Sequence, residues 1–340
     1  MPEPSGTTAK ITINDRPPVE TPTGRSLLAA LKEQAIFVPS ACGGHGVCGL
    51  CRVKVLAGAG PCTSREEALL SEADRLAGMR LACQVPVERD LRLTIPDDFF
   101  NAREYKAEVV AFRDLTPDIR EITLQLQSPP AMDFKAGQYI QLRIPPYEQS
   151  RRTIYRAYSI ASPPSARGRL ELEVRQVLNG VGTTYLCKHL PLNTYVVFNG
   201  PYGEFYLRES NRAIILIAGG SGMAPMKAML GDMQERKIRR NVRYFFGARA
   251  RRDLFLMDEM QALEQSLPDF RFIPALSKPL PEDQWTGETG LITEVLDRHL
   301  ENLYPGEAYL CGSPAMIQAC IKILQKKGVA KDRIFYDTFA

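Results

Sequence analysis

The chain has 340 residues, of which 44% are hydrophobic and 24% are charged, and this is the composition of an ordinary globular protein with room for two or three domains. A formal net charge of +4 without a polybasic run gives no indication of nucleic-acid binding. The longest strongly apolar stretch, residues 213–218, is too short to cross a bilayer, and the first residues lack the apolar core of a signal peptide. The sequence therefore predicts a cytoplasmic protein without a transmembrane segment, either free or peripheral to a membrane complex.

Residues 1–101 predict a small domain of mixed strands and helices. Residues 10–13 alternate in polarity as a strand does, and residues 52–56 and 90–95 are typical of further strands. Ser26 can cap a short helix, because its hydroxyl can accept a hydrogen bond from an amide of the first turn. This order of strand, helix and strand favours a β-grasp fold of the ferredoxin type.

A glycine-rich loop in this domain carries Cys42, Cys48 and Cys51, and Cys83 follows the last of them by 32 residues. Four thiolates can hold two tetrahedral irons bridged by sulfide. The spacing is close to the plant-type ferredoxin pattern, with five residues in the first gap where that pattern has four. Glycines in such a loop let backbone amides turn toward the sulfur atoms without a Cβ clash. The sequence therefore predicts a [2Fe–2S] cluster on these four cysteines.

Two other interpretations of the cysteines are weaker. A zinc site usually shows paired C-x2-C units, and this loop has a single such unit, Cys48 with Cys51. A disulfide is disfavoured in a chain without a secretory signal. The remaining thiols are scattered and are expected to be small buried hydrophobic groups: Cys62, Cys187, Cys311 and Cys320.

After a linker at residues 96–101, residues 102–207 predict a barrel. Short strand candidates follow one another between proline and glycine breakers, without long helices. Six short strands in this arrangement favour a small antiparallel barrel. The candidates are residues 105–112, 119–126, 139–144, 155–160, 170–177 and 194–198.

Residues 208–340 change to alternating strands and helices. Residues 214–217 form a continuous apolar run, which is typical of a parallel strand buried on both faces. The alternation predicts a doubly wound parallel sheet, expected to bind NAD(P)H. The strand candidates are residues 214–217, 242–246, 270–275, 308–311 and 334–336, and the helix candidates are residues 226–235, 257–266, 291–300 and 315–326.

The first of these parallel strands runs into a glycine-rich turn. Glycines between a strand and a helix let a pyrophosphate approach the backbone, and the helix N-terminus supplies amides and the positive end of its dipole. The turn lacks the G-x-G-x-x-G fingerprint, and many such turns are merely tight connections, but its position after the first strand of a doubly wound sheet favours dinucleotide binding. The candidate residues are Gly219, Gly220, Gly222, Met223, Ala224 and Pro225.

The barrel segment contains an Arg-Ala-Tyr-Ser motif at residues 156–159. Arg156 could clamp a phosphate, Tyr158 could lie on a flat ring, and Ser159 could meet a ring heteroatom. The simpler interpretation is a strand with alternating polar and aromatic faces, and the motif by itself favours that one.

A second barrel motif reads Gly-Val-Gly-Thr-Thr at residues 180–184. The amides and hydroxyls of Gly182, Thr183 and Thr184 could bind phosphate. A glycine turn with a helix cap is equally compatible with these residues, so the motif does not decide the matter unaided.

Taken in order, these motifs resemble the ferredoxin–NADP reductase superfamily along residues 102–340. The series continues with residues 199–205 (Asn-Gly-Pro-Tyr-Gly-Glu-Phe), the turn at Gly219 and residues 311–314 (Cys-Gly-Ser-Pro). With the N-terminal ferredoxin-type domain, the whole chain resembles the family of the F subunit of the Na⁺-translocating NADH:quinone oxidoreductase. That family carries an N-terminal membrane helix that is missing here, so the resemblance implies a soluble relative to which sodium pumping does not carry over.

The resemblance implies FAD, NADH and a [2Fe–2S] cluster. Arg156 is expected at the FAD phosphates, Tyr158 on the isoalloxazine and Ser159 near its reactive nitrogen. Cys311 is expected beside the nicotinamide, and Phe339 over the other flavin face. Tyr158, Ser159, Cys311 and Phe339 are therefore the predicted catalytic residues. The further predicted cofactor contacts are Gly182, Thr183, Thr184, Gly219, Gly220, Gly222, Met223, Ala224, Pro225, Gly247, Arg249 and Gly312.

The expected function is that of an NADH:acceptor oxidoreductase. NADH gives up a hydride as a unit, a [2Fe–2S] cluster takes one electron at a time, and a flavin can do both. The expected acceptor is a separate protein, such as an oxygenase, a ferredoxin-like protein or a quinone-reductase partner. The alternatives are the reductase component of a multicomponent oxygenase, the F subunit of the quinone oxidoreductase without its membrane anchor and, from another class, a redox sensor that only binds NADH.

The choice of dinucleotide depends on a group of arginines. Arg249, Arg251 and Arg252 stand where a 2′-phosphate could lie, and arginine is a good phosphate partner. Asp253 follows directly and can offset their charge, and the resemblance favours relatives that use NADH. The sequence therefore predicts NADH as the electron donor.

Overall fold

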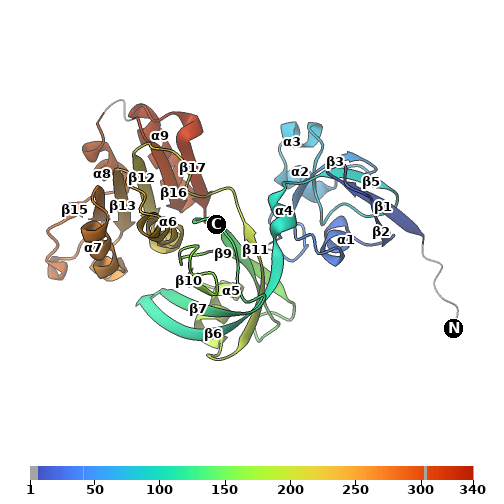
Figure 1. Ribbon diagram of the computed structural model, residues 1–340, viewed down its shortest axis with the longest axis horizontal. Helices are drawn as coiled ribbons and strands as arrows, with labels where there is room; N and C mark the ends of the chain where they lie inside the picture. The colour runs from blue at the N-terminus through green and yellow to red at the C-terminus, as the bar shows by residue number, and fades with distance from the viewer. Residues whose placement is uncertain (1–6, 41, 302–304, 340) are drawn as a thin grey trace. The chain divides into compact units, whose positions relative to one another are not determined.

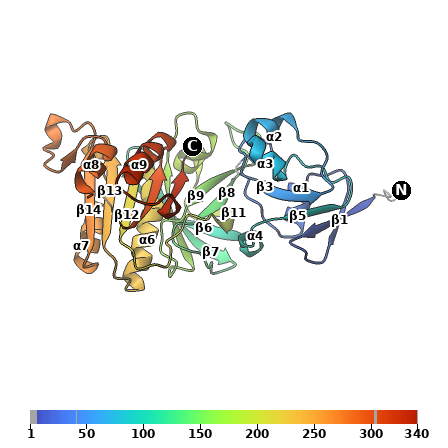
Figure 2. The ribbon, with the colours of Figure 1, turned by 90° about the horizontal axis from the view of Figure 1, so that it is seen from above.

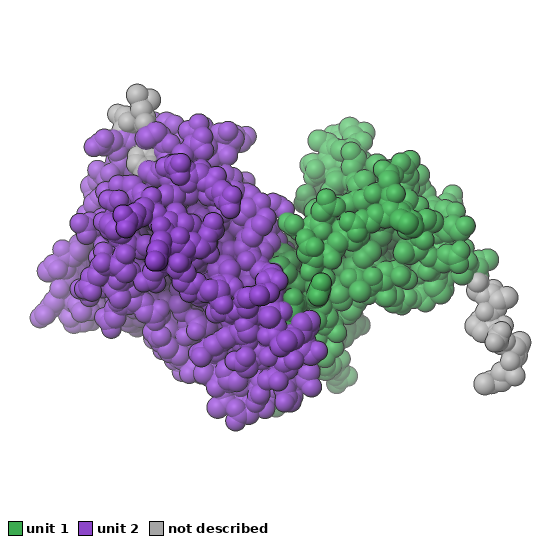
Figure 3. Space-filling view, viewed as in Figure 1, with its two compact units in different colours: residues 1–105, 140–157, 196–202 green, residues 106–139, 158–195, 203–340 purple. Residues whose placement is uncertain are grey.

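The computed structural model describes residues 7–40, 42–301 and 305–339, and the chain divides into two compact units (Figure 3). Unit 1 comprises Met1–Tyr105, Ile140–Ala157 and Val196–Tyr202, and unit 2 comprises Lys106–Tyr139, Tyr158–Tyr195 and Gly203–Ala340. The predicted domain boundaries, after residues 101 and 207, stay a prediction.

A five-stranded mixed sheet forms the core of the N-terminal part, with strand order β2-β1-β5-β3-β4 (Figure 1). β1 runs antiparallel to β2 but parallel to β5, and β3 runs antiparallel to both β5 and β4. This is the β-grasp fold that the sequence predicted. The strands are β1 (Thr8–Ile13), β2 (Val19–Pro22), β3 (Arg52–Ala57), β4 (Met79–Leu81) and β5 (Leu91–Thr94).

The helices of this part are short, and side-chain caps define where they begin. Ser26 accepts a hydrogen bond from the Ala29 amide at 3.3 Å, which confirms the predicted cap of α1. Thr63 and Glu66 form a capping box at the start of α2. The helices are α1 (Leu27–Glu33), α2 (Ser64–Leu69), α3 (Glu72–Leu76) and α4 (Asp98–Asn101).

The second sheet has six strands in the order β10-β7-β6-β11-β8-β9. β7 runs antiparallel to both β6 and β10. An antiparallel bridge between Ile160 and Leu172 joins the segment after β9 to β10, and this brings the two edges of the sheet together. The antiparallel barrel is therefore confirmed. Its strands are β6 (Arg103–Thr116), β7 (Ile119–Ser128), β8 (Tyr139–Ile144), β9 (Ile154–Ser159), β10 (Arg169–Arg175) and β11 (Tyr195–Tyr202).

The third sheet has the order β15-β14-β13-β12-β16-β17, and all of its neighbouring strands run parallel. β12 comes first in the chain and lies in the middle, so the sheet is wound outward in both directions, as predicted. The strands are β12 (Ile214–Gly219), β13 (Val242–Ala248), β14 (Phe270–Leu276), β15 (Glu288–Thr289), β16 (Glu307–Gly312) and β17 (Ile334–Thr338).

Helices cover both faces of this parallel sheet (Figures 1 and 2). Alternate residues of β12 face two separate cores: Leu216 packs with α6 and α7, and Ile217 packs with α8 and α9. None of the helices in the described ranges is long and apolar enough to cross a membrane. The helices are α6 (Met223–Glu235), α7 (Met257–Ser266), α8 (Ile292–His299) and α9 (Pro314–Lys326).

The structure departs from the predicted elements at short segments. The predicted linker contains α4, whose Phe99 and Phe100 pack against the ferredoxin-type core. α6 begins at Met223, three residues earlier than predicted, because the 3-10 turn Gly220–Gly222 leads directly into it. β2, β4, α2, α3 and β15 were not predicted, because segments of two to six residues are too short to show a periodic pattern.

A buried ion pair fixes α2 to β4, just before Cys83. Glu66 is fully buried and accepts hydrogen bonds from Arg80 Nε at 2.8 Å and from the Leu81 amide at 3.0 Å. Burial acts to raise the pKa of Glu66, but the Arg80 guanidinium and the backbone amides outweigh burial and hold this pKa below its usual value. The carboxylate therefore ties α2 to the strand that leads into Cys83.

We expect Glu66→Ala to lower the free energy of unfolding by about 3–5 kcal/mol, because it leaves the buried Arg80 without a counter-charge. Denaturant unfolding of the full chain measures this. Glu67→Ala is the control, since Glu67 meets Arg75 at 3.7 Å in an exposed pair that should contribute about 0–1 kcal/mol. The stabilisation by Glu66 should be lost as the pH falls through its lowered pKa, because protonation then breaks the pair. Equal stabilities of the two variants would contradict this account.

Candidate functional site

The cysteine loop connects α1 to β3 and folds around left-handed glycines. Gly43, Gly44, Gly46 and Gly49 all have positive φ, between 66° and 91°. A Cβ on Gly46 would lie 2.5 Å from Gln84 Nε2 and 2.9 Å from Arg65 Cδ, so these two side chains would have to move to make room for it. The left-handed glycines are the backbone conformation that the sequence predicted would let amides turn toward the sulfur atoms.

The four predicted ligands lie as two hydrogen-bonded thiol pairs. Burial acts to raise the pKa of Cys42, but hydrogen bonds from the Val47 amide and the Cys48 thiol outweigh it and lower this pKa to about 7. A hydrogen bond from the Cys51 thiol is the main reason why the pKa of Cys83 falls to about 6. The pKa values of Cys48 and Cys51 are raised, by burial and by the shared proton with Cys83 respectively. One thiolate in each pair is thus favoured near neutral pH.

Two thiol pairs suit a binuclear cluster, in which each iron takes two protein thiolates. A structural zinc site would instead gather four ligands around one ion. The amides of Val47, Gly44, Leu50 and Gly46 point at the sulfur atoms and can stabilise the negative charge of a cluster. The residues present therefore fit a [2Fe–2S] group.

The cysteine loop lies against the segment that leads into β9, within unit 1. A Cβ on Gly43 would be 3.6 Å from the Thr153 carbonyl oxygen, which is van der Waals contact. The Ser40 amide donates to Gln141 Oε1 of β8 at 3.0 Å, and Lys32 Nζ donates to the Tyr155 hydroxyl at 3.2 Å. The thiols are therefore close to the strand that carries the Arg-Ala-Tyr-Ser motif.

β9 carries the three residues predicted for the flavin. Arg156 is partly buried, and its Nη1 donates to the Tyr155 carbonyl at 2.8 Å. Tyr158 is partly buried, whereas Ser159 is buried and its Oγ has no hydrogen-bond partner among the described residues. An orphaned buried hydroxyl indicates a polar group that belongs there, and a flavin ring nitrogen fits it. The residues therefore fit FAD, and the individual roles stay predictions.

The Gly-Val-Gly-Thr-Thr motif forms α5 (Val181–Thr184), which continues into the π-helical turn η1 (Tyr185–His189). Gly182 and Thr184 are buried. The Thr183 hydroxyl donates to the Gly180 carbonyl and accepts from the Val177 amide, both at 3.1 Å. Thr183 thus closes its own turn, and its predicted contact with a pyrophosphate stays a prediction.

The nucleotide turn and Cys311 are locked together by a close backbone approach. A Cβ on Gly222 would lie 2.3 Å from the Cys311 carbonyl oxygen, so this position has room for glycine alone. Gly219 approaches the Gly247 carbonyl, and a Cβ there would be 3.3 Å away. Met223, Ala224 and Pro225 are buried at the start of α6. The turn thus meets the carboxyl ends of β13 and β16, where ligands bind in doubly wound sheets.

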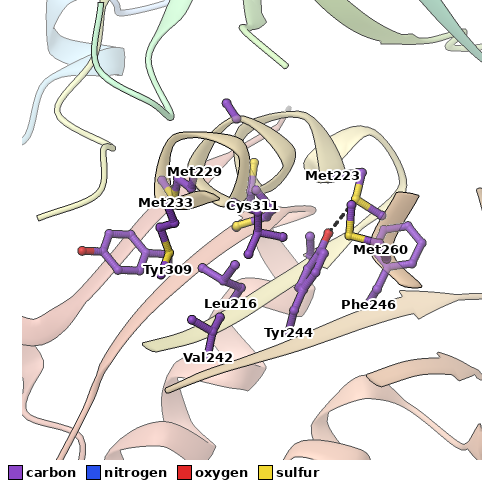
Figure 4. Close-up of a cluster of buried hydrophobic side chains, with 14 of the residues drawn as sticks. Leu216, Met223, Met229, Met233, Val242, Tyr244, Phe246, Met260, Tyr309 and Cys311 are labelled. Carbon is purple, nitrogen blue, oxygen red and sulfur yellow. Dashed lines mark hydrogen bonds between the residues drawn. The ribbon is translucent and has the colours of Figure 1, made fainter. Parts of the chain in front are cut away.

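Cys311 is fully buried on the face of the sheet that α6 covers, in one cluster with Met223 and Tyr244 (Figure 4). Burial raises the pKa of this thiol well above its usual value, so it is neutral. Phe339 is partly buried against the same cluster, and its amide donates to the Gly312 carbonyl at 2.9 Å. The chain end is therefore docked beside the predicted nicotinamide residues.

Asp337 is a residue of this region that the sequence analysis missed. It stands opposite Cys311 in the parallel register of β16 and β17, and burial raises its pKa to about 6. It also lines a cavity of about 290 Å³ together with residues 203–205 and 335–336. A carboxyl near the chain end gave no periodic or spacing signal, because its surroundings depend on strand register.

The arginines after β13 have partners of their own. Arg251 Nη1 donates to the Asp283 carbonyl at 3.0 Å, and the Arg251 amide donates to Asp283 Oδ2 at 3.2 Å. Arg252 Nε lies 3.9 Å from Asp253 Oδ1. Arg249 is exposed next to Gly247, at the end of β13. These contacts favour NADH over NADPH, because two of the three arginines already meet acidic residues or backbone oxygens.

Glu173 and Lys227 were also missed. Glu173 lies in β10 and is 4% exposed. Lys227 is held by Glu121 at 2.8 Å and by Glu171 at 2.9 Å. A lysine within the otherwise apolar start of α6 was the one available signal that this helix covers a charged face.

Three family models match the chain in succession. The 2Fe-2S iron-sulfur cluster binding domain matches residues 11–88, the oxidoreductase FAD-binding domain matches residues 106–206, and the oxidoreductase NAD-binding domain matches residues 216–322. The chain is therefore an oxidoreductase whose three parts match an iron–sulfur, a flavin and a dinucleotide module.

Curated relatives match nearly the whole chain. The F subunit of the Na(+)-translocating NADH-quinone reductase of Klebsiella pneumoniae is 34% identical over 94% of this chain and 88% of its own length. Its counterpart in Neisseria gonorrhoeae is 34% identical over 97% of this chain and 91% of its own length.

Solved structures match with similar coverage. A cytochrome P450 reductase from Amycolatopsis has a TM-score of 0.80 and 28% identity, covering 98% of this chain and 99% of its own. A ferredoxin reductase in carbazole 1,9a-dioxygenase has a TM-score of 0.75 and 26% identity, covering 99% of this chain and 100% of its own.

We expect Cys83→Ser to remove or destabilise the cluster while FAD stays bound, because the thiol pair with Cys51 is lost and the barrel is untouched. Iron and sulfide content, with the visible spectrum, measure this. Cys62→Ser is the matched control, because Cys62 lies in the same part of the chain but outside the two pairs. Full iron and sulfide content in Cys83→Ser would overturn the ligand assignment.

Proposed function

Because the chain belongs to the family of the F subunit of Na(+)-translocating NADH-quinone reductase, we propose that it is an NADH-dependent iron–sulfur flavoprotein reductase. In this function a hydride from NADH reduces FAD, and single electrons then pass through the [2Fe–2S] cluster to a separate protein acceptor. When bound, FAD supplies the change from two-electron to one-electron chemistry, and the chain's own residues bind, orient and shield the reactants.

The single observation that carries the proposal is the position of the two thiol pairs beside the start of β9. Thr153 and Tyr155 lie next to the cysteine loop, and the same strand ends at the buried, orphaned hydroxyl of Ser159. The strand that carries the Arg-Ala-Tyr-Ser motif therefore begins next to the loop that would hold the cluster, which supports electron transfer between a flavin and that cluster.

The remaining residues are proposed to act as follows. Arg156 binds the FAD phosphates, and Tyr158 packs on the isoalloxazine. The glycine turn at residues 219–222 receives the pyrophosphate of NADH at the N-terminus of α6. Cys311, neutral and buried, lies at the nicotinamide side, and Phe339 covers the other face of the flavin.

The acceptor is proposed to dock at the cysteine loop, where electrons leave the chain. Val47 is 66% exposed and Leu50 is 40% exposed on this loop, so two apolar side chains next to the proposed cluster are accessible to a partner. A membrane-complex partner fits the curated relatives. An oxygenase partner is the second candidate, because two solved reductases of oxygenase systems match almost the full chain.

The optical spectrum of the purified protein, before and after anaerobic NADH, tests the proposed function. Flavin and iron–sulfur absorption should both be present, and NADH should bleach the flavin and then reduce the cluster. A redox sensor would hold the cluster without rapid reduction of a flavin by NADH. If extraction yields FMN or no flavin, the FAD assignment is wrong.

We expect Arg156→Ala to weaken FAD binding by about 1.5–3 kcal/mol, the scale of a hydrogen bond to a charged group. The dissociation constant of FAD, measured by flavin fluorescence during titration of the apoprotein, gives this value. Arg152→Ala is the control, because Arg152 is exposed on the preceding loop. Unchanged FAD affinity in Arg156→Ala would remove this residue from the flavin site.

We expect kcat/KM for NADH to exceed that for NADPH at least tenfold, which corresponds to about 1.4 kcal/mol. Steady-state reduction of an artificial electron acceptor with each dinucleotide measures the ratio. Arg251 holds Asp283, so Arg251→Ala should leave the preference for NADH in place. A preference for NADPH that disappears in Arg251→Ala would show instead that this arginine reads the 2′-phosphate.

A further inference from the structure

Glu173 is a buried carboxyl group in a strand of the barrel. It lies in β10 with 4% exposure, and neither carboxyl oxygen has a hydrogen-bond partner among the residues that the structure describes. Leu172 and Val174, its neighbours in the strand, are fully buried, and Glu171, on the same face as Glu173, pairs with Lys227 of α6. A buried polar group that finds no partner costs free energy and calls for an explanation.

The charges around Glu173 favour its protonated form. Lys227 on α6 is the cation that faces it, but Glu121 of β7, Glu171 and Glu259 of α7 already surround that lysine at 2.8, 2.9 and 3.8 Å. Burial is the main cause that raises the pKa of Glu173 well above its usual value, and the three carboxylates add to it while Lys227 opposes it. Tyr244 of β13 and Cys311 of β16 also face it, and both are neutral, since burial raises the pKa of each.

Glu173 stands opposite Ser159 across the seam that closes the barrel. Ile160 is bridged to Leu172, and the Ala161 amide donates to the Glu171 carbonyl at 2.8 Å. In this antiparallel register the next pair is Ser159 with Glu173, whose Cβ atoms are then about 4.5–5.5 Å apart on the same face. Two buried, orphaned oxygen-bearing side chains thus oppose each other beside Cys311.

We propose that Glu173 is a positioning residue for the flavin: when the flavin is bound, the neutral carboxyl group of Glu173 turns to donate a hydrogen bond to Ser159 Oγ, a contact that the two side chains do not make in this structure, and so directs the Ser159 hydroxyl toward the reactive nitrogen of the ring. This inference rests on the proposed function, which puts a flavin next to Ser159. It adds a residue that no spacing motif in the chain contains.

The hydrogen-bonding capacity of the two protonation states explains the effect. A neutral carboxyl can donate to Ser159 Oγ, and the Ser159 O–H is then available for an acceptor on the ring. An ionised carboxylate can only accept, so it takes the Ser159 O–H for itself and removes the donor from the flavin. Ionisation of Glu173 should therefore change the environment of the oxidised flavin and slow its reduction by NADH. The ionisation releases one proton from Glu173 to the solvent, and the Ser159 hydroxyl keeps its own proton while it turns from the ring to the carboxylate.

The stability of the protein gives a readout that does not depend on activity. Between the usual glutamate pKa and the raised pKa in the folded protein, the folded chain keeps a proton that the unfolded chain has released, so stability falls as the pH rises. Glu173→Gln removes this titration. The unfolding equilibrium constants of wild type and Glu173→Gln should diverge by up to about tenfold per pH unit in this window, with the wild type losing stability.

The bound flavin gives the readout that is specific to positioning. In the wild type, the visible spectrum of oxidised FAD should show a one-proton transition as the pH rises, and the rate of flavin reduction by NADH should fall at least tenfold with the same midpoint. Both changes should be absent in Glu173→Gln and in Ser159→Ala. Glu235→Gln is the control, because it makes the same substitution at an exposed glutamate of α6, and it should keep both changes.

If Glu173→Gln loses FAD or does not fold, an infrared difference spectrum of the wild type, recorded before and after reduction by NADH, still tests the proposal. A protonated-carboxyl band that shifts on reduction, and that moves in Glu173→Asp, would support the proposal. The absence of such a band, or a spectral transition that persists in Glu173→Gln, would overturn it. A wild type that binds no FAD, or is not reduced by NADH, would instead defeat the proposed function, so the two failures are distinguishable.

Discussion

One lysine under three carboxylates holds the nucleotide-binding sheet of unit 2 to the barrel strands of the same unit. Lys227 of α6 pairs with Glu121 of β7, Glu171 of β10 and Glu259 of α7. Burial acts to lower the pKa of Lys227, but the carboxylates outweigh burial and raise it, so the lysine stays charged in a nearly dry seam. Buried pairs of this kind are strongly destabilising to break, and they fix geometry as well as contributing stability.

The seam sets the positions of the groups that surround the proposed flavin and nicotinamide. β10 passes directly beside the nucleotide turn, since a Cβ on Gly220 would lie 3.4 Å from Arg175 Nη1. At Gly222 the backbone of the same turn packs directly against the Cys311 carbonyl and leaves no room for a Cβ. Arg175, Glu173 and Cys311 therefore reach one small region from two different sheets. A shift of α6 along β10 would move all of them together, which is why the ion pairs of Lys227 matter for the site and not only for stability.

The two ends of the proposed electron path are built in different ways. Around Cys42 and Cys83 the backbone provides the environment, because left-handed glycines turn amides toward the sulfur atoms. Around Ser159 and Cys311 side chains buried by packing provide it, and they are held neutral because nothing solvates a charge there. A negatively charged cluster needs backbone amides that point at its sulfur atoms. A hydride transfer that must exclude water needs packed, neutral side chains instead.

Short-range signals in the sequence were sufficient for the fold and for much of the site. The cysteine spacing, the cap at Ser26, the six barrel strands and the alternation after residue 208 each depend on residues close together in the chain, and the β-grasp sheet, the barrel and the parallel sheet all follow them. The glycines at 219–222 predicted a strand-to-helix turn for the same reason: a backbone conformation or close approach that glycine alone permits is visible in one residue type.

Only the tertiary structure decided which polar residues are buried. Glu173 and Asp337 look like ordinary strand residues. Glu173 is buried because α6 covers one face of β10, and Asp337 is partly buried because β17 pairs in register with Cys311. Ser159 and Glu173 are 14 residues apart, and only the closing bridge at Ile160 and Leu172 places them opposite each other. The sequence by itself determined the modules and the residue types that can hold each cofactor. Long-range packing decided which ionisable groups are desolvated and therefore have shifted pKa values. Desolvation depends on neighbours that no local sequence pattern encodes.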